Sequence, residues 1–348
     1  MIPISLCIIT KNEAQKLRKC LSCIKDYVPE IVVVDTGSSD DSIAVAKEFT
    51  DCVYTFEWIK DFAAARNFSI SKASHDWILV LDTDEYVEQF DLETTYKLME
   101  ENPQSVGRLL RFSDGISGTV TVDRVERLFN KTYYHYERPI HEQVLPIDPQ
   151  KTAYAEFNIP LKCQHDGYVG SPEDVAGKAL RNLDILLESV KDYPDSYTYF
   201  QIAQSYYLLH DDENAKIYYE KGLDFDLNPE SEFVQIMVVN YCYTLFHLNE
   251  KEKALTFATD LEPYFQNYGD FQFLLGYLHT SQQHIMKAIL SFIKATQCSH
   301  FHTDGVTTFR AYHYLGTIYE AIGNQELANS FFQKRDNCPN VDQNHLLI

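Results

Sequence analysis

Three carboxylates within four residues follow an apolar stretch of the chain. Residues 78–81 read Ile-Leu-Val-Leu, and Asp82, Asp84 and Glu85 come directly after them. Packing gains nothing from concentrating like charges, because each charge raises the pKa of its neighbours unless a cation is close. A hard divalent ion, Mg²⁺ or Mn²⁺, relieves this repulsion and typically binds one or two protein carboxylates together with the phosphate oxygens of a substrate. The segment therefore indicates a metal-assisted site, although an Asp-x-Asp taken alone is more typical of a solvated acidic turn.

Other polar residues stand at the ends of neighbouring apolar stretches. Thr10, Asn12 and Glu13 follow residues 4–9, and Asp35 follows residues 31–34. Arg66 lies on the helix expected before the acidic segment. Singly, each has an adequate structural explanation as a cap, a turn residue or a surface charge. Jointly they offer what a nucleotide needs, namely an acceptor for the imide N–H of a base, acceptors for ribose hydroxyls, and a cation for phosphate.

These residues need a sheet to bring them together, and the hydrophobic pattern predicts one. Short apolar strands alternate with helices of amphipathic spacing: strands at 4–9, 31–34, 52–56 and 77–81, and helices at 13–26, 40–49 and 61–73. Fully apolar strands that alternate with helices are typical of a parallel sheet covered on both faces, where ligands bind at the carboxyl ends of the strands. Residues 105–144 alternate with period two, which predicts antiparallel ribbons appended to the sheet.

The rest of the chain is expected to be helical and repetitive. Ser171 and Pro172 look like a helix start, so we predict one domain at residues 1–170 and a second at 171–348. Small residues recur at intervals of 39, 34 and 40, at Ala215, Ala254, Ala288 and Ala328. Twelve positions before three of them stand Ala203, Gly276 and Gly316, and four positions after stand Tyr219, Phe292 and Phe332. This pattern resembles the tetratricopeptide repeat, in which helix pairs bury their apolar faces by stacking; the unit around Ala254 departs from it.

Charge and composition restrict the partners. Lys and Arg number 30 against 51 Asp and Glu, so the net charge is −21. Such a protein repels phosphate backbones over most of its surface, which disfavours nucleic acid and anionic membranes as partners and means that a diphosphate substrate needs local help from a metal or basic groups. Residues 171–348 alone carry −12, which favours a neutral or basic partner for the repeats. We expect a cytoplasmic protein without a membrane span, because no secretory signal or apolar run of about 20 residues is present.

Taken together, the motifs resemble a known family. The segments that carry the resemblance are residues 9–13, 34–40, 62–69, 77–85, 127–129, 140–143 and 165–168, in that order. They are similar to family 2 glycosyltransferases with the GT-A fold, and most of all to the subgroup of bacteriocin-modifying sublancin-type S-glycosyltransferases and lipopolysaccharide-core glucosyltransferases. The resemblance implies an α/β domain with a Rossmann-like mixed sheet, followed by an all-α domain of tetratricopeptide-like repeats, which also occurs in that subgroup.

The resemblance assigns roles to individual residues. It implies that the nucleotide-sugar is bound by Thr10, Asn12, Glu13, Asp35, Arg66 and Asp82, with Asp35 on the base and Asp82 on the ribose or a metal-bound water. Asp84 would be the main carboxylate on a Mn²⁺ or Mg²⁺ ion. His165 would complete the metal site from the other side, or would instead be a histidine satisfied by hydrogen bonds at a domain junction.

An inverting enzyme of this kind needs a base that deprotonates the acceptor. Glu142 is our first choice, because it follows the ribbon that faces the acceptor in this fold. The sequence departs here from the commoner Glu-Asp dipeptide of the wider family. Asp166 and Glu85 remain alternatives. His141 is an alternative base if the acceptor is a thiol, because a thiol has a lower pKa than a hydroxyl and a weaker base can deprotonate it.

The sequence therefore predicts a metal-dependent transfer of a hexose from a nucleotide-diphosphate sugar, with UDP as the expected nucleotide, to a peptide Cys or Ser or to a glycan. The repeats would grip a peptide acceptor, form a homodimer or buttress the first domain. One alternative is a non-catalytic repeat scaffold with a degenerate nucleotide-binding domain. Another is a nucleotidyltransferase, but the segment after the first strand contains no glycine for a phosphate loop.

Overall fold

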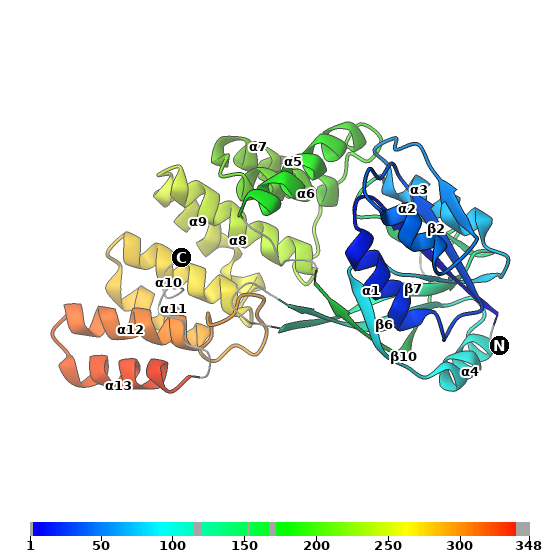
Figure 1. Cartoon of the computed structure of the whole chain (residues 1–348). Coiled ribbons are helices and arrows are strands. Elements are labelled where there is room, and N and C mark those ends of the chain that lie inside the picture. Colours follow the sequence, from blue (N-terminus) through cyan, green and yellow to red (C-terminus); the bar gives the residue numbers. More distant parts are fainter. Residues whose placement is uncertain (1–2, 115–119, 152–153, 167–171, 339–348) are drawn as a thin grey trace. The chain divides into compact units, whose positions relative to one another are not determined.

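The computed structural model describes residues 3–114, 120–151, 154–166 and 172–338. The chain forms two compact units, Met1–Ser189 and Val190–Ile348 (Figure 1). The helix that begins at Pro172 thus belongs to the first unit, whereas the sequence analysis grouped it with the repeats. Ser171, its expected N-cap, lies outside the described residues. No helix of the described ranges is long and apolar enough to cross a membrane.

An eight-stranded mixed sheet forms the centre of the first unit. Its strand order is β3-β2-β1-β4-β7-β6-β10-β5. The strands are β1 (Ile4–Thr10), β2 (Glu30–Asp35), β3 (Val53–Thr55), β4 (Trp77–Val80), β5 (Glu85–Phe90), β6 (Val106–Asp114), β7 (Val120–Asn130) and β10 (Glu156–His165). The first four strands of this order are parallel, as their apolar residues predict. β7 then pairs antiparallel with β4.

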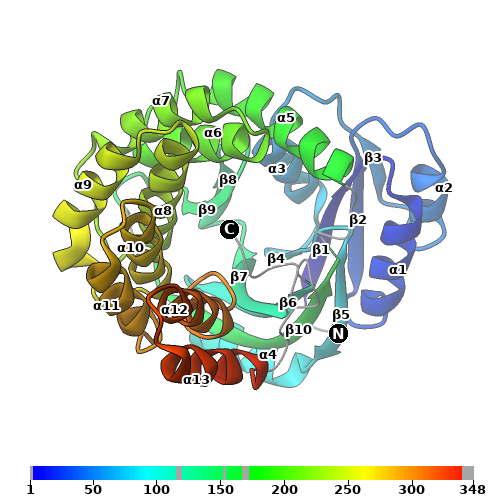
Figure 2. The same cartoon turned by 90° about the vertical axis from the view of Figure 1, so that its left-hand side faces the viewer.

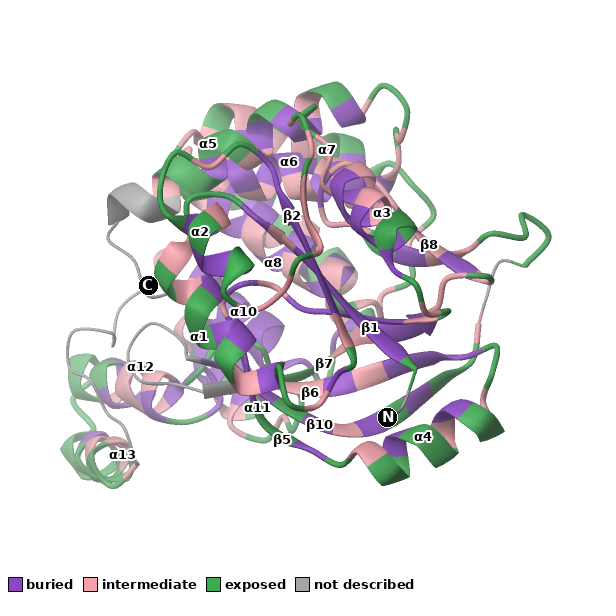
Figure 3. Ribbon diagram, turned by 45° about the vertical axis from the view of Figure 1, so that its right-hand side comes forward, coloured by how far each residue is buried: buried purple, intermediate pink, exposed green. Residues whose placement is uncertain are grey.

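Helices cover both faces of the sheet, and the alternation of side chains along β1 shows how. Ile4, Leu6 and Ile8 point to the face that packs against α1 (Ala14–Ile24), α2 (Ser42–Lys47) and α4 (Leu92–Glu101). Cys7 points to the opposite face, beneath α3 (Phe62–Lys72) and the small ribbon of β8 (Tyr134–Glu137) and β9 (Gln143–Pro146). Figure 3 shows β1 and β2 buried along their length and the outer side of α4 exposed. The predicted three-layer α/β fold is therefore confirmed.

The antiparallel ribbons differ in placement from the expectation. β6 and β7 do form an antiparallel pair, but they lie inside the main sheet and join β4 to β10. Leu128 and Phe129 explain this position, because they occupy opposite faces of β7 and both are fully buried. Only β8 and β9 form a separate two-stranded ribbon. The strands β5 and β10 complete the far edge of the sheet, where an antiparallel pair brings His165 beside Glu85.

The second unit consists of helix pairs in sequence order, as Figure 2 shows. The pairs are α6 (Ser196–Leu208) with α7 (Asp212–Leu223), α8 (Glu232–His247) with α9 (Lys251–Leu261), α10 (Gly269–Ser281) with α11 (Ile285–Ala295), and α12 (Phe309–Ala321) with α13 (Gln325–Asp336); the short 3-10 turn η1 (Glu262–Tyr264) follows α9. The four repeated alanines all lie on the second helix of a pair and are fully buried. The repeat alignment is thus confirmed, including the divergent unit around Ala254.

Two glycines show why small residues recur in the first helices. A Cβ atom on Gly276 would lie 2.7 Å from the ring of Phe292, and a Cβ on Gly316 would lie 2.4 Å from the ring of Phe332. These are the aromatic residues that the spacing of the repeat predicted. The missing side chain therefore lets an aromatic ring of the second helix approach the backbone of the first.

Candidate active site

The three carboxylates of the acidic segment after β4 differ in their surroundings: Asp82 and Asp84 line a pocket, whereas Glu85 is fully buried. Asp82 is clamped by two arginines: its Oδ1 accepts from Nη2 of Arg66 at 2.6 Å and its Oδ2 from Nη2 of Arg127 at 2.6 Å. Glu85 is fully buried and accepts from Arg127 at 2.8 Å. Asp84 lies between them and lines the pocket. The three carboxylates therefore have different roles in the structure.

Arg127 reaches this segment because of the register of β7. Since β7 runs antiparallel to β4 with Leu128 opposite Leu79, the residue before Leu128 comes level with Val80, the last residue of β4. Sequence reasoning noticed the stretch 127–129 but assigned Arg127 no role. The missing information is the strand pairing, which no local spacing reveals.

Asp84 and His165 approach each other across the pocket. The Nε2 atom of His165 lies 3.7 Å from Oδ1 of Asp84, and its Nδ1 is hydrogen-bonded to Oγ of Ser113 at 3.0 Å. A hydrogen bond on one ring nitrogen orients the imidazole and leaves the other free to bind, as in many metal sites. Lys16 lies 3.7 Å from the other carboxylate oxygen of Asp84.

This pair fits a divalent ion that shares its coordination with a ligand. Within the described residues no group of three or more His, Cys, Asp or Glu side chains is arranged to hold a metal. One carboxylate and one imidazole are the protein ligands available, and Mn²⁺ or Mg²⁺ commonly completes its shell with phosphate oxygens and water. Asp84 and His165 could therefore hold such an ion only together with a ligand that supplies further oxygens.

The carboxyl ends of β1 and β2 present two buried polar atoms that lack a partner. Among the described side chains, Oγ1 of Thr10 and Oδ1 of Asp35 are buried without a hydrogen bond. The second oxygen of Asp35 accepts from the backbone N–H groups of Gly37 and Ser38, both at 3.0 Å, which fixes the carboxylate. An unsatisfied buried acceptor costs free energy, so a ligand that donates to it is favoured. Asp35 is 1% exposed and is absent from the pocket lining, so its expected role on the base stays a prediction.

Asn12 and Glu13 differ in what they do. Asn12 lies in the left-handed region with φ 54°, and its Oδ1 accepts from the backbone N–H of Ser39 at 2.7 Å. It therefore joins the loops after β1 and β2 and is absent from the pocket lining. Glu13 lines the pocket, and its carboxylate accepts from Oγ1 of Thr83. The nucleotide-binding role expected for Asn12 stays a prediction, in which it acts by shaping the loop.

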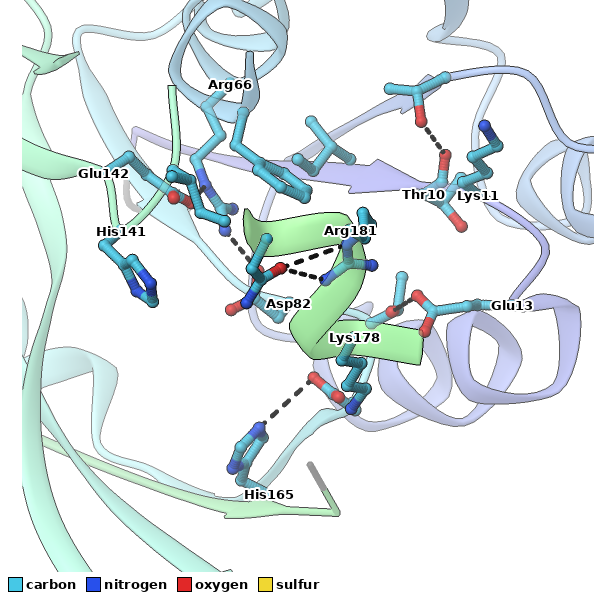
Figure 4. A pocket seen from close by; sticks show the side chains of 17 residues that line it. Thr10, Lys11, Glu13, Arg66, Asp82, His141, Glu142, His165, Lys178 and Arg181 are labelled. Atoms are coloured by element: carbon cyan, nitrogen blue, oxygen red, sulfur yellow. Dashed lines mark hydrogen bonds and ion pairs between the residues drawn. The ribbon is translucent and has the colours of Figure 1, made fainter. Parts of the chain in front are cut away.

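Arg66 lies on α3 and is almost completely buried, with 5% exposure. Besides Asp82 it binds Glu142, whose Oε1 accepts from its Nε at 2.5 Å (Figure 4). Its Nη1 is buried without a partner. Burial lowers the pKa of this guanidinium, but Asp82 and Glu142 outweigh that effect and raise it, so Arg66 is charged at every relevant pH.

Glu142 is positioned by the loop before β9. The backbone N–H of Phe62 donates to the carbonyl of Pro139 at 2.8 Å, and the amide of Asn67 exchanges two hydrogen bonds with the backbone of Tyr136. These contacts hold the β8–β9 ribbon against α3. The loop residue His141 has a φ of 52° and lines the same pocket as Glu142.

The structure separates the candidate bases. Glu85 is fully buried within an ion-pair cluster, which closes it off from an acceptor. Asp166 lies 3.3 Å from Nζ of Lys19 and is absent from the pocket lining. Glu142 and His141 both line the pocket. Burial lowers the pKa of His141, so its imidazole is neutral at pH 7 and able to accept a proton.

A cavity of about 380 Å³ brings most of the predicted site together. The predicted residues on its wall are Thr10, Glu13, Arg66, Asp82, Asp84, Glu142 and His165. Lys178, Arg181 and Asn182 also line it, from α5 (Pro172–Ser189), and sequence reasoning missed them. The sequence gives only two basic residues three apart on a helix, which is a common surface pattern.

The fold and the site define the class: a Rossmann-like α/β domain with a polar pocket at the carboxyl edge of its sheet, followed by stacked helix pairs. Residues 5–155 match the model of glycosyl transferase family 2, and residues 196–229 match that of the tetratricopeptide repeat. The first unit is thus similar to family 2 glycosyltransferases over residues 5–155, and the second unit is similar to the tetratricopeptide repeat over residues 196–229.

Named relatives agree with both parts. A TPR repeat-containing protein of Synechococcus elongatus is 33% identical over 201 residues, which cover 56% of this chain and 50% of that protein. The SPbeta prophage-derived glycosyltransferase SunS of Bacillus subtilis is 29% identical over 259 residues, covering 70% of this chain and 58% of SunS. An uncharacterized glycosyltransferase of Rickettsia felis is 38% identical over 85 residues, 24% of this chain and 30% of that protein. The chain thus spans between half and three fifths of the length of the first two.

Proposed function

We propose that the chain is a glycosyltransferase that moves a hexose from a nucleotide-diphosphate sugar to an acceptor. The observation that carries the proposal is that Thr10, Asp84 and His165, from the ends of β1, β4 and β10, line the same pocket. The family 2 domain and the relative named as a glycosyltransferase support the reaction class. We take UDP as the nucleotide, and a peptide Cys or Ser or a glycan as the acceptor.

In this proposal the nucleotide lies at the ends of β1 and β2. The unpaired oxygen of Asp35 accepts the imide N–H of the base, and the unpaired hydroxyl of Thr10 bonds the nucleotide beside it. Glu13 offers a carboxylate for the ribose hydroxyls. Asp82 is already bonded through both oxygens, so it acts mainly by orienting Arg66 and Arg127.

Asp84 and His165 would hold a Mn²⁺ or Mg²⁺ ion. When bound, such an ion neutralises the charge that grows on the departing diphosphate. Ser113 keeps the imidazole of His165 oriented, and Lys16 lies beside the carboxylate of Asp84. These two neighbours tune how strongly the pair attracts a cation.

Glu142 is the proposed base for a hydroxyl acceptor. Its position on the pocket wall supports this role, and its ion pair with Arg66 holds the carboxylate in place there. His141 is the alternative for a thiol acceptor, because it is neutral at pH 7 and a thiol gives up its proton more readily than a hydroxyl.

Nucleoside-diphosphate release tests the proposal. The purified chain is incubated with UDP-glucose or UDP-N-acetylhexosamine and Mn²⁺, with and without a chelator, and released UDP is measured. We expect release that depends on the metal and falls at least about a hundredfold in Asp84→Asn, since one well-placed electrostatic group is worth about 10²–10³ in rate. Glu88→Gln, an exposed carboxylate on β5, is the matched control and is expected to keep its activity.

The outcomes are distinct. Release of UDP that survives both Asp84→Asn and the chelator would reject the role of the metal, while the proposed glycosyltransferase activity would still stand. A folded protein that binds no nucleotide sugar and releases nothing would favour the repeat scaffold instead.

A role for the repeats is proposed separately. Stacked helix pairs offer an extended surface, so we propose that the acidic repeats bind a neutral or basic peptide acceptor. Identical transfer rates to a peptide acceptor by the full chain and by a folded variant lacking residues 190–348 would contradict this.

A further inference from the structure

We infer that Lys178 and Arg181 of α5 form a cationic wall that binds the diphosphate of the donor. The sheet would supply the ligands for the base, the ribose and the metal, and α5 would supply positive charge. This inference rests on the proposed function and deepens it, because it requires the ligand of this pocket to be a nucleoside diphosphate.

The two side chains come from one stretch of α5 and line the pocket of the sheet. Lys178 and Arg181 are three residues apart, a spacing that puts them on the same side of a helix. Figure 4 shows both side chains extending from α5 into the pocket that also holds Asp82 and Glu13. Both are exposed, so a ligand in the pocket can reach them.

The orientation of α5 is fixed by its other residues. Ala179, Leu183 and Leu186 follow helical spacing and are buried. Asp184 forms an ion pair at 2.7 Å with Lys60, which lies just before α3 begins. The guanidinium of Arg181 lies 5.6 Å from the ring centre of Phe62, the first residue of α3. Hence α5 is tied to the same helix that carries Arg66.

The charges in the pocket show why these cations matter. Arg66 lines the pocket too, but Asp82 and Glu142 already neutralise it. Arg181 donates to Oδ1 of Asn182 at 3.2 Å and covers an aromatic ring, and both partners are uncharged. Its positive charge is therefore retained for a ligand.

The chemistry of the reaction creates the need for this charge. When the bond between the anomeric carbon and the phosphate oxygen breaks, its electron pair stays on that oxygen. The departing nucleoside diphosphate then carries about three negative charges, which exceed the two positive charges of one divalent ion. Arginine binds phosphate through two parallel N–H donors, and lysine binds it as a point charge. Counting the carboxylate of Asp84 as well, the excess is about two negative charges, which Lys178 and Arg181 together would balance.

Binding of three related probes tests the inference. The affinities of uridine, UMP and UDP are measured by calorimetry with Mn²⁺ for the full chain and for Lys178→Gln, Arg181→Gln and the double variant. A hydrogen bond to a charged group is worth about 1.5–3 kcal/mol, so each single variant is expected to bind UDP at least about tenfold more weakly. The affinity for UMP should fall less than the affinity for UDP, and the affinity for uridine should not change. Arg181→Lys is expected to restore most of the affinity.

Lys191→Gln is the matched control, because Lys191 is exposed, follows α5 closely and is absent from the pocket lining. It removes the same charge and should leave UDP binding unchanged. The inference is overturned if the double variant binds UDP as tightly as the unmodified chain, or if it loses uridine and UDP equally, which would mean a general disturbance of the pocket. Failure of the unmodified chain to bind UDP or any other nucleoside diphosphate would instead refute the proposed function itself.

Discussion

Replacing Arg127 with methionine is expected to destabilise the first unit by about 3 kcal/mol. Nη2 of Arg127 bonds Glu85 at 2.8 Å and Asp82 at 2.6 Å. Glu85 is fully buried, so in the variant water cannot replace the lost partner. Removing one member of a buried ion pair typically costs about 3–5 kcal/mol, because the other charge is left uncompensated.

The structure places the expected value at the low end of that range. Arg111 lies 3.4 Å from the same oxygen of Glu85 and still neutralises part of its charge. The backbone N–H of Asp82 also donates to the second oxygen of Glu85 at 3.0 Å and remains in the variant. Asp82 is partly exposed and keeps its ion pair with Arg66, so losing its bond to Arg127 adds little to the destabilisation.

Tryptophan fluorescence during urea unfolding measures this effect in the first unit alone. The chain has two tryptophans, Trp58 and Trp77, and both lie within Met1–Ser189. With a slope of about 2–3 kcal/mol per molar urea for a unit of this size, 3 kcal/mol lowers the midpoint by about 1 M. The control is Arg124→Met, an exposed residue on the same strand, which should change stability by less than about 0.5 kcal/mol.

A second substitution distinguishes charge from packing. If an unpaired buried carboxylate causes the loss, adding Glu85→Gln to Arg127→Met should recover part of the stability, because the remaining side chain is neutral. A loss below about 1 kcal/mol in Arg127→Met, or a double variant that is less stable by the sum of both single effects, would refute the reasoning.

Three further predictions concern the charge of Asp82, the packing of Gly276 and the proposed role of Asp35. Burial raises the pKa of Asp82, but its two arginines outweigh this effect and lower the pKa below its usual value. The charged carboxylate therefore stabilises the first unit fully above about pH 4, and this contribution is lost as the pH falls through the lowered pKa. In urea titrations, the difference in stability between the unmodified chain and Asp82→Asn should narrow only below about pH 4. Gly276→Ala should destabilise the repeats by about 1–3 kcal/mol in thermal melts followed by circular dichroism, whereas Gly177→Ala, with open space around its Cβ, should cost nothing or stabilise α5 by about 0.4–1 kcal/mol. Asp35→Asn should weaken binding of uridine at least about tenfold, since it turns an acceptor toward the base into a group that competes as a donor; unchanged affinity would place the base elsewhere.

Much of the fold could be predicted because its signals are local. The apolar strands 4–9, 31–34 and 77–81 and the helices between them follow from hydrophobic period alone, and their parallel order follows from the alternation. The small residues of the repeats were also visible from their spacing, and Gly276 and Gly316 each face an aromatic ring at the same distance along the chain. These features depend on residues that are close in sequence.

What could not be predicted depends on pairing between distant segments. β7 lies between β4 and β6 because two adjacent residues, Leu128 and Phe129, are both buried, and only that register takes Arg127 to Asp82. The position of α5 depends on contacts with Lys60 and Phe62, more than a hundred residues earlier. Thus the acidic residues of the site were identified from the sequence, while most of the cations that hold or complement them were not.

This asymmetry matters for the proposed base. Three guanidiniums face four carboxylates in one chain of ion pairs, namely Arg66, Arg111 and Arg127 against Asp82, Glu85, Asp123 and Glu142. The cluster as a whole carries one excess negative charge, which a proton taken from an acceptor would cancel. Glu85 is closed off, Asp82 is bonded through both oxygens, and Asp123 is absent from the pocket lining. Glu142 is therefore the carboxylate of this cluster at which that proton can arrive from an acceptor in the pocket.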